Sequence, residues 1–161
     1  CAALPQQALA FSQLHADRLR RLGRSAIVLT GLYDGDIGPP VPPLHPPTFV
    51  YAGRMIPEKR VPLLIEAFAL ALAARPDLRL RLFGRGPERG LVEERIQALG
   101  LTDAAILSGF VDQTELDAAM ASAVAIVQPS AREGYGLVVV EANARGVPAI
   151  VVAGEDNAAV E

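Results

Sequence analysis

The feature that most constrains the fold of this chain is a regular alternation of short apolar runs and longer amphipathic segments beyond residue 47. The apolar runs predict strands, and the segments between them have helical periodicity. Strands that alternate with helices pair in parallel, since each crossover returns the chain to the same end of the sheet. The sequence therefore predicts an α/β domain with a doubly wound parallel sheet and helices on both faces. The expected strands are 48–52, 78–83, 104–108, 123–128 and 148–152, and the expected helices are 59–74, 88–99, 113–121 and 137–145.

One of these helices runs against local propensity. Residues 138–140 are three consecutive valines, and β-branched residues favour a strand. A glycine-rich turn precedes them, however, and Gly146 and Pro148 follow, as is typical of the end of a helix. Because packing outweighs propensity in a buried helix, we expect a helix here.

A proline-rich stretch divides the chain. Six prolines between residues 39 and 47 predict a stiff, extended connector. Upstream of it, residues 6–22 predict a helix and residues 25–30 a strand. We expect residues 1–38 to be a remnant helix and strand of a preceding domain, and residues 39–47 to be the connector. Residues 48–161 then form one domain, which is truncated near its C-terminus at the start of a further helix around residues 154–157.

The net charge and its distribution argue against a nucleic-acid-binding protein. A net charge of −3 creates no field that would attract nucleic acid. Four arginines at positions 18, 20, 21 and 24 favour a solvated helix face, with contact to an anionic membrane surface as the alternative.

The sequence contains no recognisable targeting signal. No run approaches the length of a membrane span, and no signal peptide is recognisable. Cys1 is the sole cysteine, so no internal disulfide can form and we expect a cytoplasmic protein. Because the chain does not begin with methionine, we expect it to be a piece of a longer protein.

A glycine-rich turn follows the fourth predicted strand. Gly134 and Gly136 flank Tyr135 and leave the backbone N–H groups of the turn unobstructed. A helix that begins near Leu137 would direct its first N–H groups and the positive end of its dipole toward the same place. This arrangement suits an anion, and phosphate is the natural occupant.

Two carboxylates accompany this turn. Glu133 precedes the predicted helix and Glu141 lies within it, so both can accept hydrogen bonds from the hydroxyls of a sugar and a ribose. The spacing alone is not specific, because Glu58 and Glu66 have the same spacing on a solvated helix face. The alternative for the Glu133 pair is likewise a plain glycine turn with surface acids.

A pair of cations occupies the loop after the first predicted strand of the domain. Lys59 is the only lysine among fifteen basic residues, and it shares this loop with Arg54. In an open α/β sheet such loops bind ligands, and two cations suit a diphosphate. The alternative is a surface ion pair of either residue with Glu58.

A further glycine cluster superficially resembles a dinucleotide-binding fingerprint. Gly84, Gly86 and Gly90 give the spacing G-x-G-x-x-x-G in place of G-x-G-x-x-G. Pro87 and Glu88 would also place a ring and a negative charge where a pyrophosphate should dock. We therefore reject a nicotinamide cofactor and interpret Pro87 as a first-turn residue of the next helix.

Taken together, these motifs resemble the C-terminal, donor-binding domain of family 4 (group 1) retaining glycosyltransferases of the GT-B fold. The resemblance covers roughly residues 48–161 and implies a Rossmann-like sheet, one half of a GT-B fold. Tyr135 stands where the family often has phenylalanine. The matching motifs, in order, are Gly53-Arg54 with Lys59, Gly84 to Pro87, Gly109-Phe110-Val111, and Pro129-Ser130 through Glu133-Gly134-Tyr135-Gly136-Leu137 to Glu141-Ala142, followed by Gly146-Val147-Pro148.

The resemblance implies a hexosyltransferase that moves a sugar from a nucleotide diphosphate donor, of the UDP, GDP or ADP type, to an acceptor hydroxyl. Configuration would be retained, no metal or other cofactor would be needed, and the product would be a polysaccharide or glycolipid. It assigns catalytic roles to Arg54 and Lys59 at the diphosphate and to Glu133 at the sugar. The implied donor-binding positions are Gly53, Gly84, Val111 (main chain, at the base), Ser130, Gly134, Tyr135, Gly136, Leu137 and Glu141 (at the ribose).

The resemblance also implies a partner, the N-terminal acceptor domain of the same protein, so we expect this chain alone to bind its donor without turning over. No nucleic-acid partner is expected, and a membrane surface is a partner only for the full-length enzyme. Two alternatives stay open: a nucleotide-sugar 2-epimerase, and a non-catalytic sugar-nucleotide binding module. His15 and His45 are isolated in the sequence, so we expect surface or loop positions for them and no metal site.

Overall fold

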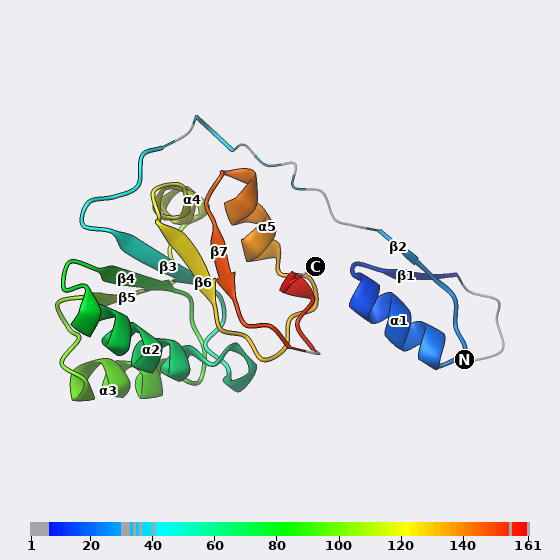
Figure 1. Ribbon diagram of the computed structural model, residues 1–161, viewed down its shortest axis with the longest axis horizontal. Coiled ribbons are helices and arrows are strands. Elements are labelled where there is room, and N and C mark those ends of the chain that lie inside the picture. Colours follow the sequence, from blue (N-terminus) through cyan, green and yellow to red (C-terminus); the bar gives the residue numbers. More distant parts are fainter. Residues whose placement is uncertain are drawn as a thin grey trace.

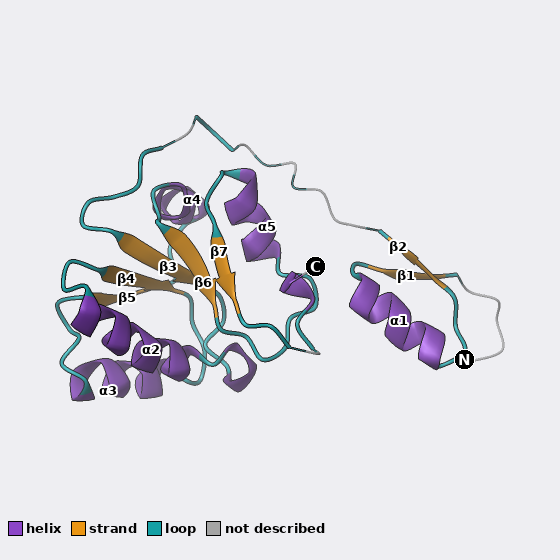
Figure 2. Cartoon of the chain, viewed as in Figure 1, coloured by secondary structure: helices purple, strands orange, loops and turns teal. Residues whose placement is uncertain are grey.

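The computed structural model describes residues 7–29, 33, 35, 37–39, 41–154 and 156–160. The alternating region forms a five-stranded sheet in the order β5-β4-β3-β6-β7, and every pair of neighbouring strands is parallel (Figures 1 and 2). This confirms the predicted α/β fold with a doubly wound parallel sheet. The strands are β3 (Thr48–Ala52), β4 (Arg79–Phe83), β5 (Ala105–Gly109), β6 (Ala125–Gln128) and β7 (Ala149–Val151).

Helices cover both faces of this sheet, and each face has its own core. The helices α2 (Val61–Ala74) and α3 (Arg89–Ala98) pack on one face, and α4 (Gln113–Ala121) and α5 (Leu137–Ala144) pack on the other. Successive residues of a strand point to opposite faces. In β3, Tyr51 therefore enters the core beneath α2 and α3, whereas Val50 and Ala52 enter the core beneath α4 and α5.

The helix predicted across the three valines is present as α5. It begins after Gly136, which has a φ of 79°, and Gly146, with a φ of 74°, follows its end. Val139 and Ala142 are buried against the sheet. Burial of this face and glycine at both ends therefore override the β-propensity of the valines.

The N-terminal part differs from its prediction. A strand, β1 (Ala8–Ala10), occupies the first part of the helix expected over residues 6–22, and α1 (Gln13–Arg21) begins only after Ser12. The Ser12 hydroxyl accepts a hydrogen bond from the His15 N–H, so Ser12 is an N-cap whose signal the prediction passed over. The predicted strand at residues 25–30 is seen as β2 (Ala26–Val28), parallel to β1, while residue 30 lies outside the described residues.

Smaller differences occur at other boundaries. A short 3-10 helix, η1 (Pro57–Lys59), precedes α2, and α3 begins at Arg89, so Pro87 lies before that helix and not in its first turn. The further helix expected near residues 154–157 is a 3-10 turn, η2 (Ala158–Val160). Within the described ranges, no helix combines the length and the apolar character needed to cross a membrane.

The sheet order fixes where a ligand can bind. From β3 the chain moves outward to β4 and β5, then returns to the other side of β3 to form β6. The loops after β3 and β6 therefore lead to helices on opposite faces of the sheet. Crevices of this kind, at the carboxyl ends of the strands where the strand order reverses, are the usual ligand sites of open α/β sheets.

Candidate functional site

A cavity of about 310 Å³ lies at this crevice. Its wall combines the end of β3 and the following loop with the end of β6, the glycine-rich turn and the first residues of α5. The lining residues are Ala52, Gly53, Arg54, Lys59, Gln128, Glu133, Tyr135, Gly136, Leu137, Val138 and Val139. The structure therefore brings the two predicted cations and the predicted glycine-rich turn to one place.

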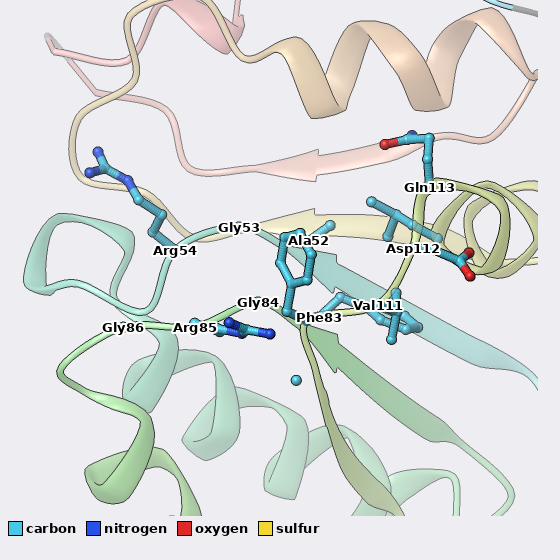
Figure 3. A pocket seen from close by; sticks show the side chains of 13 residues that line it. Ala52, Gly53, Arg54, Phe83, Gly84, Arg85, Gly86, Val111, Asp112 and Gln113 are labelled. Carbon is cyan, nitrogen blue, oxygen red and sulfur yellow. The ribbon is translucent and has the colours of Figure 1, made fainter.

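A second cavity of about 640 Å³ adjoins the first at the ends of β3, β4 and β5 (Figure 3). The two cavities share Ala52, Gly53 and Arg54. Mainly apolar and backbone groups line the larger one, including Gly84 and Val111, which were both predicted as site residues. A ligand with a flat apolar part and a charged part would place the two parts in the larger and the smaller cavity.

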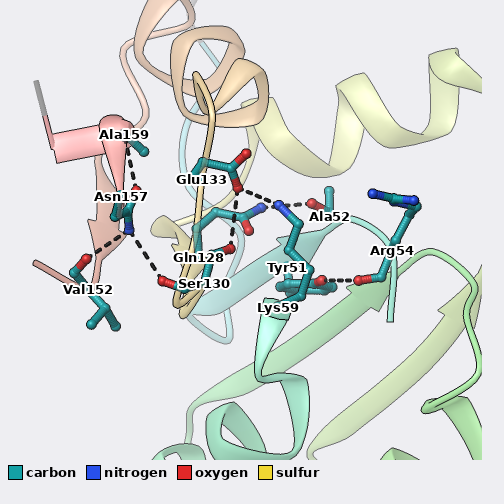
Figure 4. Close-up of polar contacts among 10 residues, drawn as sticks. All are labelled: Tyr51, Ala52, Arg54, Lys59, Gln128, Ser130, Glu133, Val152, Asn157 and Ala159. Atoms are coloured by element: carbon teal, nitrogen blue, oxygen red, sulfur yellow. Dashed lines mark hydrogen bonds and ion pairs between the residues drawn. The ribbon is translucent and has the colours of Figure 1, made fainter. Parts of the chain in front are cut away.

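The smaller cavity contains an ion pair between Lys59 and Glu133 (Figure 4). The side chains of these residues are 18% and 19% exposed, so the pair is partly shielded from solvent. The partner of Lys59 is thus Glu133, and the alternative of a surface pair with Glu58 is wrong for this residue. The pair places a cation and a hydrogen-bond-accepting carboxylate side by side.

Ser130, predicted as a donor-binding residue, packs next to Glu133. It is 1% exposed and does not line either cavity, and its hydroxyl donates to the Glu133 carboxylate across 3.3 Å. Ser130 therefore helps to orient Glu133, and its direct contact with a donor stays a prediction.

The loops after β3 and β4 touch at Gly53 and Gly84. A Cβ atom on Gly84 would come within 1.8 Å of the Gly53 carbonyl oxygen, and the φ of Gly84 is 134°. Only glycine permits this approach and this backbone conformation. The close approach lets main-chain groups of both loops line the larger cavity.

Tyr51 supports the loop after β3, a role that was not predicted from the sequence. It is fully buried, and its hydroxyl donates to the Arg54 carbonyl oxygen across 2.8 Å (Figure 4). Burial raises the pKa of the Tyr51 hydroxyl well above its usual range, with smaller contributions from the charges of Glu133 and Glu88. The hydroxyl therefore stays protonated and holds the backbone of Arg54 in place.

The N-terminus of α5 opens into the smaller cavity. Its N-cap is Gly136, which has no side chain to bond the first N–H groups of the helix. A Cβ atom on Gly136 would come within 2.7 Å of the Ala159 Cβ, so η2 packs against the turn. The Val139 N–H donates to the Gly136 carbonyl oxygen, and the N–H groups ahead of it in the helix, together with the helix dipole, favour an anion at this point.

Of three further predicted residues, one lines a cavity and two do not. Tyr135 lines the smaller cavity, and its ring lies 6.0 Å from that of Phe11. Gly134 lines neither cavity and faces α1, where a Cβ atom would lie 3.5 Å from His15 Cε1. Glu141 lies further along α5 and also lines neither cavity. Burial raises the pKa of the Glu141 carboxyl, Arg145 counteracts this effect and Asp117 adds to it.

The histidines have different surroundings. His15 is partly exposed on α1, and its Nδ1 lies 2.9 Å from the Ser12 hydroxyl. His45 is exposed in the connector, as predicted. In the part of the chain that the structure describes, no group of three or more histidine, cysteine or acidic residues is placed to hold a metal ion.

Gln128 is a further residue of the site that the sequence did not single out. It ends β6, its side chain is buried, and it lines the smaller cavity next to Lys59 and Glu133. The available signal was a polar residue at the end of an otherwise apolar strand, directly before Pro129. A polar side chain in such a position is buried at the end of the sheet where ligands bind.

Comparison with known proteins identifies the class. The sequence model of the family described as "Glycosyl transferases group 1" matches residues 37–160, and the chain belongs to this family. It is 41% identical over 103 residues to an exopolysaccharide phosphotransferase of Streptomyces coelicolor, a match that covers 64% of this chain and 11% of that protein. It is 32% identical over 111 residues to the UDP-N-acetylglucosamine–peptide N-acetylglucosaminyltransferase GtfA subunit of Streptococcus gordonii, covering 69% of this chain and 21% of that protein.

Comparison with solved structures gives a similar result. The structure superimposes on the pneumococcal O-GlcNAc transferase GtfA, solved in complex with UDP and GlcNAc, with a TM-score of 0.80 at 20% sequence identity. The match covers 90% of this chain and 29% of that one. The chain thus has a GT-B Rossmann-like domain, and it matches only about a tenth to a fifth of the length of the two curated relatives above.

Proposed function

We propose that this chain is the donor-binding domain of a family 4, retaining glycosyltransferase. The domain is formed by residues 48–161, with residues 39–47 as connector and residues 1–38 as the end of the N-terminal domain. The observation that carries the proposal is the meeting of Lys59, Glu133 and the α5 N-terminus around one cavity, at the point where the strand order of the sheet reverses. Ligands of open α/β folds bind at this point.

The diphosphate of the donor binds in the smaller cavity. Arg54 and Lys59 supply positive charge, and the first N–H groups of α5, beyond Gly136, supply hydrogen-bond donors. Hydrogen bonds to charged groups contribute about 1.5–3 kcal/mol each, so several of them give measurable affinity. The base binds in the larger cavity against the main chain at Val111, and Glu141 accepts the ribose hydroxyls.

Transfer follows from the same arrangement. The bond between the anomeric carbon of the sugar and the β-phosphate oxygen breaks, and its electron pair stays on the diphosphate. Arg54, Lys59 and the α5 amides stabilise the growing negative charge without reorganising. The acceptor hydroxyl forms the new bond to the anomeric carbon on the face that the diphosphate leaves, and its proton passes to an oxygen of the departing diphosphate. Glu133 positions the sugar.

The relatives support transfer over epimerisation. The Streptococcus gordonii relative is named for a UDP-sugar donor and a transfer reaction, so UDP is the first nucleotide to test. Because the match to the phosphotransferase covers 11% of that protein, we do not transfer its activity to this chain. A cytoplasmic, metal-independent hexosyltransferase remains the expectation for the whole enzyme, with peripheral contact to a membrane surface as the alternative.

Nucleotide binding tests the proposal. Thermal unfolding of the 161-residue chain is followed with UDP, GDP and ADP, each up to millimolar concentration. A ligand at a hundredfold its dissociation constant adds about 2.7 kcal/mol to stability, so the preferred nucleotide stands out. Arg54→Ala should abolish the shift, whereas the control Arg75→Ala, at an exposed arginine that pairs with Asp77, should preserve it. No response to any of the three nucleotides by the folded chain would overturn the proposal.

Catalysis has a separate test. Because the acceptor site belongs to the N-terminal domain, the chain alone should show no acceptor-dependent transfer of radiolabelled sugar, and clear turnover would contradict this. Turnover of a nucleotide sugar to its epimer without acceptor would indicate the 2-epimerase. If Glu141→Ala left the function of the parent protein intact, the non-catalytic binding module would be favoured.

A further inference from the structure

The side chain of Gln128 has one polar atom that the protein does not use. The residue is 4% exposed, and its Nε2 donates to the Ala52 carbonyl oxygen across 2.7 Å (Figure 4). Its Oε1 is buried and has no hydrogen-bond partner among the described residues. Buried polar atoms in native proteins are nearly always paired, so an unpaired one requires an explanation.

The orientation of this amide is fixed by its neighbour. The Ala52 carbonyl oxygen can only accept a hydrogen bond, so the nitrogen of the Gln128 amide must face it. The Gln128 oxygen then points the other way. The structural task of Gln128, tying the end of β6 to the end of β3, thus uses the nitrogen and leaves the oxygen available.

The location of the atom distinguishes it from the other buried unpaired oxygen. Among the described residues that second atom is Glu88 Oε2, and Glu88 lines neither cavity. Gln128 lines the smaller cavity together with Lys59 and Glu133. An unpaired acceptor in the wall of a ligand cavity indicates a hydrogen-bond donor on the ligand.

The chemistry of a nucleotide sugar selects which group this is. At neutral pH the diphosphate carries acceptor oxygens only, and these match Arg54, Lys59 and the α5 amides. An acceptor atom next to them needs an O–H or N–H group. The base belongs in the larger cavity and the ribose near Glu141, so the sugar hydroxyls are the donors within reach.

Resting on the proposed function, we infer that Gln128 Oε1 accepts a hydrogen bond from a hydroxyl of the transferred sugar, beside Glu133, and helps to select the donor sugar. A site built to bond a hydroxyl discriminates strongly against a ligand that lacks it, because its buried acceptor is then left unpaired. The expected substrates are therefore sugars with a free hydroxyl at the position that faces Gln128.

The test compares bare nucleotides with nucleotide sugars. Calorimetry measures binding of UDP, UDP-glucose and UDP-N-acetylglucosamine, or the GDP-mannose and ADP-glucose sets if wild type prefers those nucleotides, to wild type and to Gln128→Leu. The affinity of the variant for the nucleotide sugar should fall about tenfold more than its affinity for the bare nucleotide, because the lost bond to the Ala52 carbonyl oxygen affects both ligands alike. Equal weakening of both ligands, or an unchanged ratio of the two affinities, would overturn the inference.

A second measurement does not depend on the variant folding. Wild type is titrated with nucleotide sugars that lack single hydroxyls, such as the 2-, 3-, 4- and 6-deoxy forms of the preferred sugar. At least one of them should lose the advantage that the sugar gives wild type over the bare nucleotide; where Gln128→Leu folds, the same deoxy form should show no further loss in it. Full affinity for all deoxy forms would refute the role of Gln128. Failure of wild type to bind any nucleotide would instead overturn the proposed function, and the inference with it.

Discussion

Lys59 and Glu133 are 74 residues apart in the sequence, and the Lys59 ammonium group lies against the Glu133 carboxylate. The pair connects the loop after β3 to the loop after β6. A main-chain hydrogen bond from the Ala131 N–H to the Glu58 carbonyl oxygen, 2.8 Å long, joins the same two loops. Two independent contacts therefore hold the loops that form the smaller cavity.

Replacement of Lys59 tests whether its charge binds the diphosphate. Lys59→Met removes a cation from the cavity, so we expect nucleotide affinity to fall about 10- to 100-fold by calorimetry. Lys59→Arg should recover only part of the affinity, because a planar guanidinium does not reproduce a compact ammonium group. Full affinity in Lys59→Met would show that the diphosphate lies elsewhere.

The energy of the ion pair can be measured without a ligand. Urea unfolding of Lys59→Met, Glu133→Gln and the double variant gives a double-mutant cycle. Since both side chains are about four-fifths shielded, we expect a coupling energy of about 1 kcal/mol, above that of an exposed pair. Strictly additive effects would mean that the pair contributes nothing to the stability of the two loops.

Tyr51→Phe tests the support beneath Arg54. The variant keeps the buried ring but leaves the Arg54 carbonyl oxygen without its 2.8 Å hydrogen bond. A lost buried hydrogen bond costs about 1–2 kcal/mol, which should appear as a lower urea midpoint with an unchanged slope. We also expect weaker nucleotide binding, since Arg54 is then less well positioned. An unchanged midpoint would contradict this account.

Two glycines provide a matched comparison of backbone requirements. Gly84→Ala places a methyl group 1.8 Å from the Gly53 carbonyl oxygen at a φ of 134°, so we expect severe destabilisation, about 3 kcal/mol or more. Gly90→Ala lies in α3 with nothing within 4 Å and should stabilise the protein by about 0.5–1 kcal/mol. Similar melting temperatures for the two variants would refute the close approach of the two loops.

The sequence predicted the domain well where local and global signals agree. The alternation of apolar and amphipathic segments predicted all five strands of the main sheet and its four helices, with boundaries within about two residues, as is usual for such signals. The prediction over residues 138–140 held because flanking glycines outweigh three valines. It failed at residues 8–10, where a three-residue strand is too short to leave a periodic signal.

The site was predicted less completely, for a physical reason. Lys59 and Gly136 can be recognised from the sequence, because a lone lysine and a glycine-rich turn are unusual local patterns. Tyr51 and Gln128 occur in strands, and their contribution depends on which face of the sheet they meet. Only the structure shows that the Tyr51 hydroxyl reaches the Arg54 carbonyl oxygen and that the Gln128 amide reaches the Ala52 carbonyl oxygen.

The pH dependence of stability should report on Glu141. Its pKa is raised in the folded state from an ordinary value of 4.5, chiefly by burial, so the folded protein holds this proton more tightly than the unfolded chain does. Stability from this group is therefore complete below the unfolded pKa and is lost as the pH rises through the folded pKa. Glu141→Gln lacks this loss, so it should melt higher than wild type above that window and match it below.

Melting curves from about pH 4 to pH 8, with each variant compared at the same pH, isolate this contribution from the other carboxylates. Glu141→Gln should at the same time bind nucleotide more weakly, because a neutral amide accepts ribose hydroxyls less strongly than a carboxylate does. A control at an exposed acid, Glu66→Gln, should alter neither nucleotide binding nor the difference in melting temperature above the window. A stability gain without any loss of nucleotide affinity would confirm the burial of Glu141 and remove it from the ribose site.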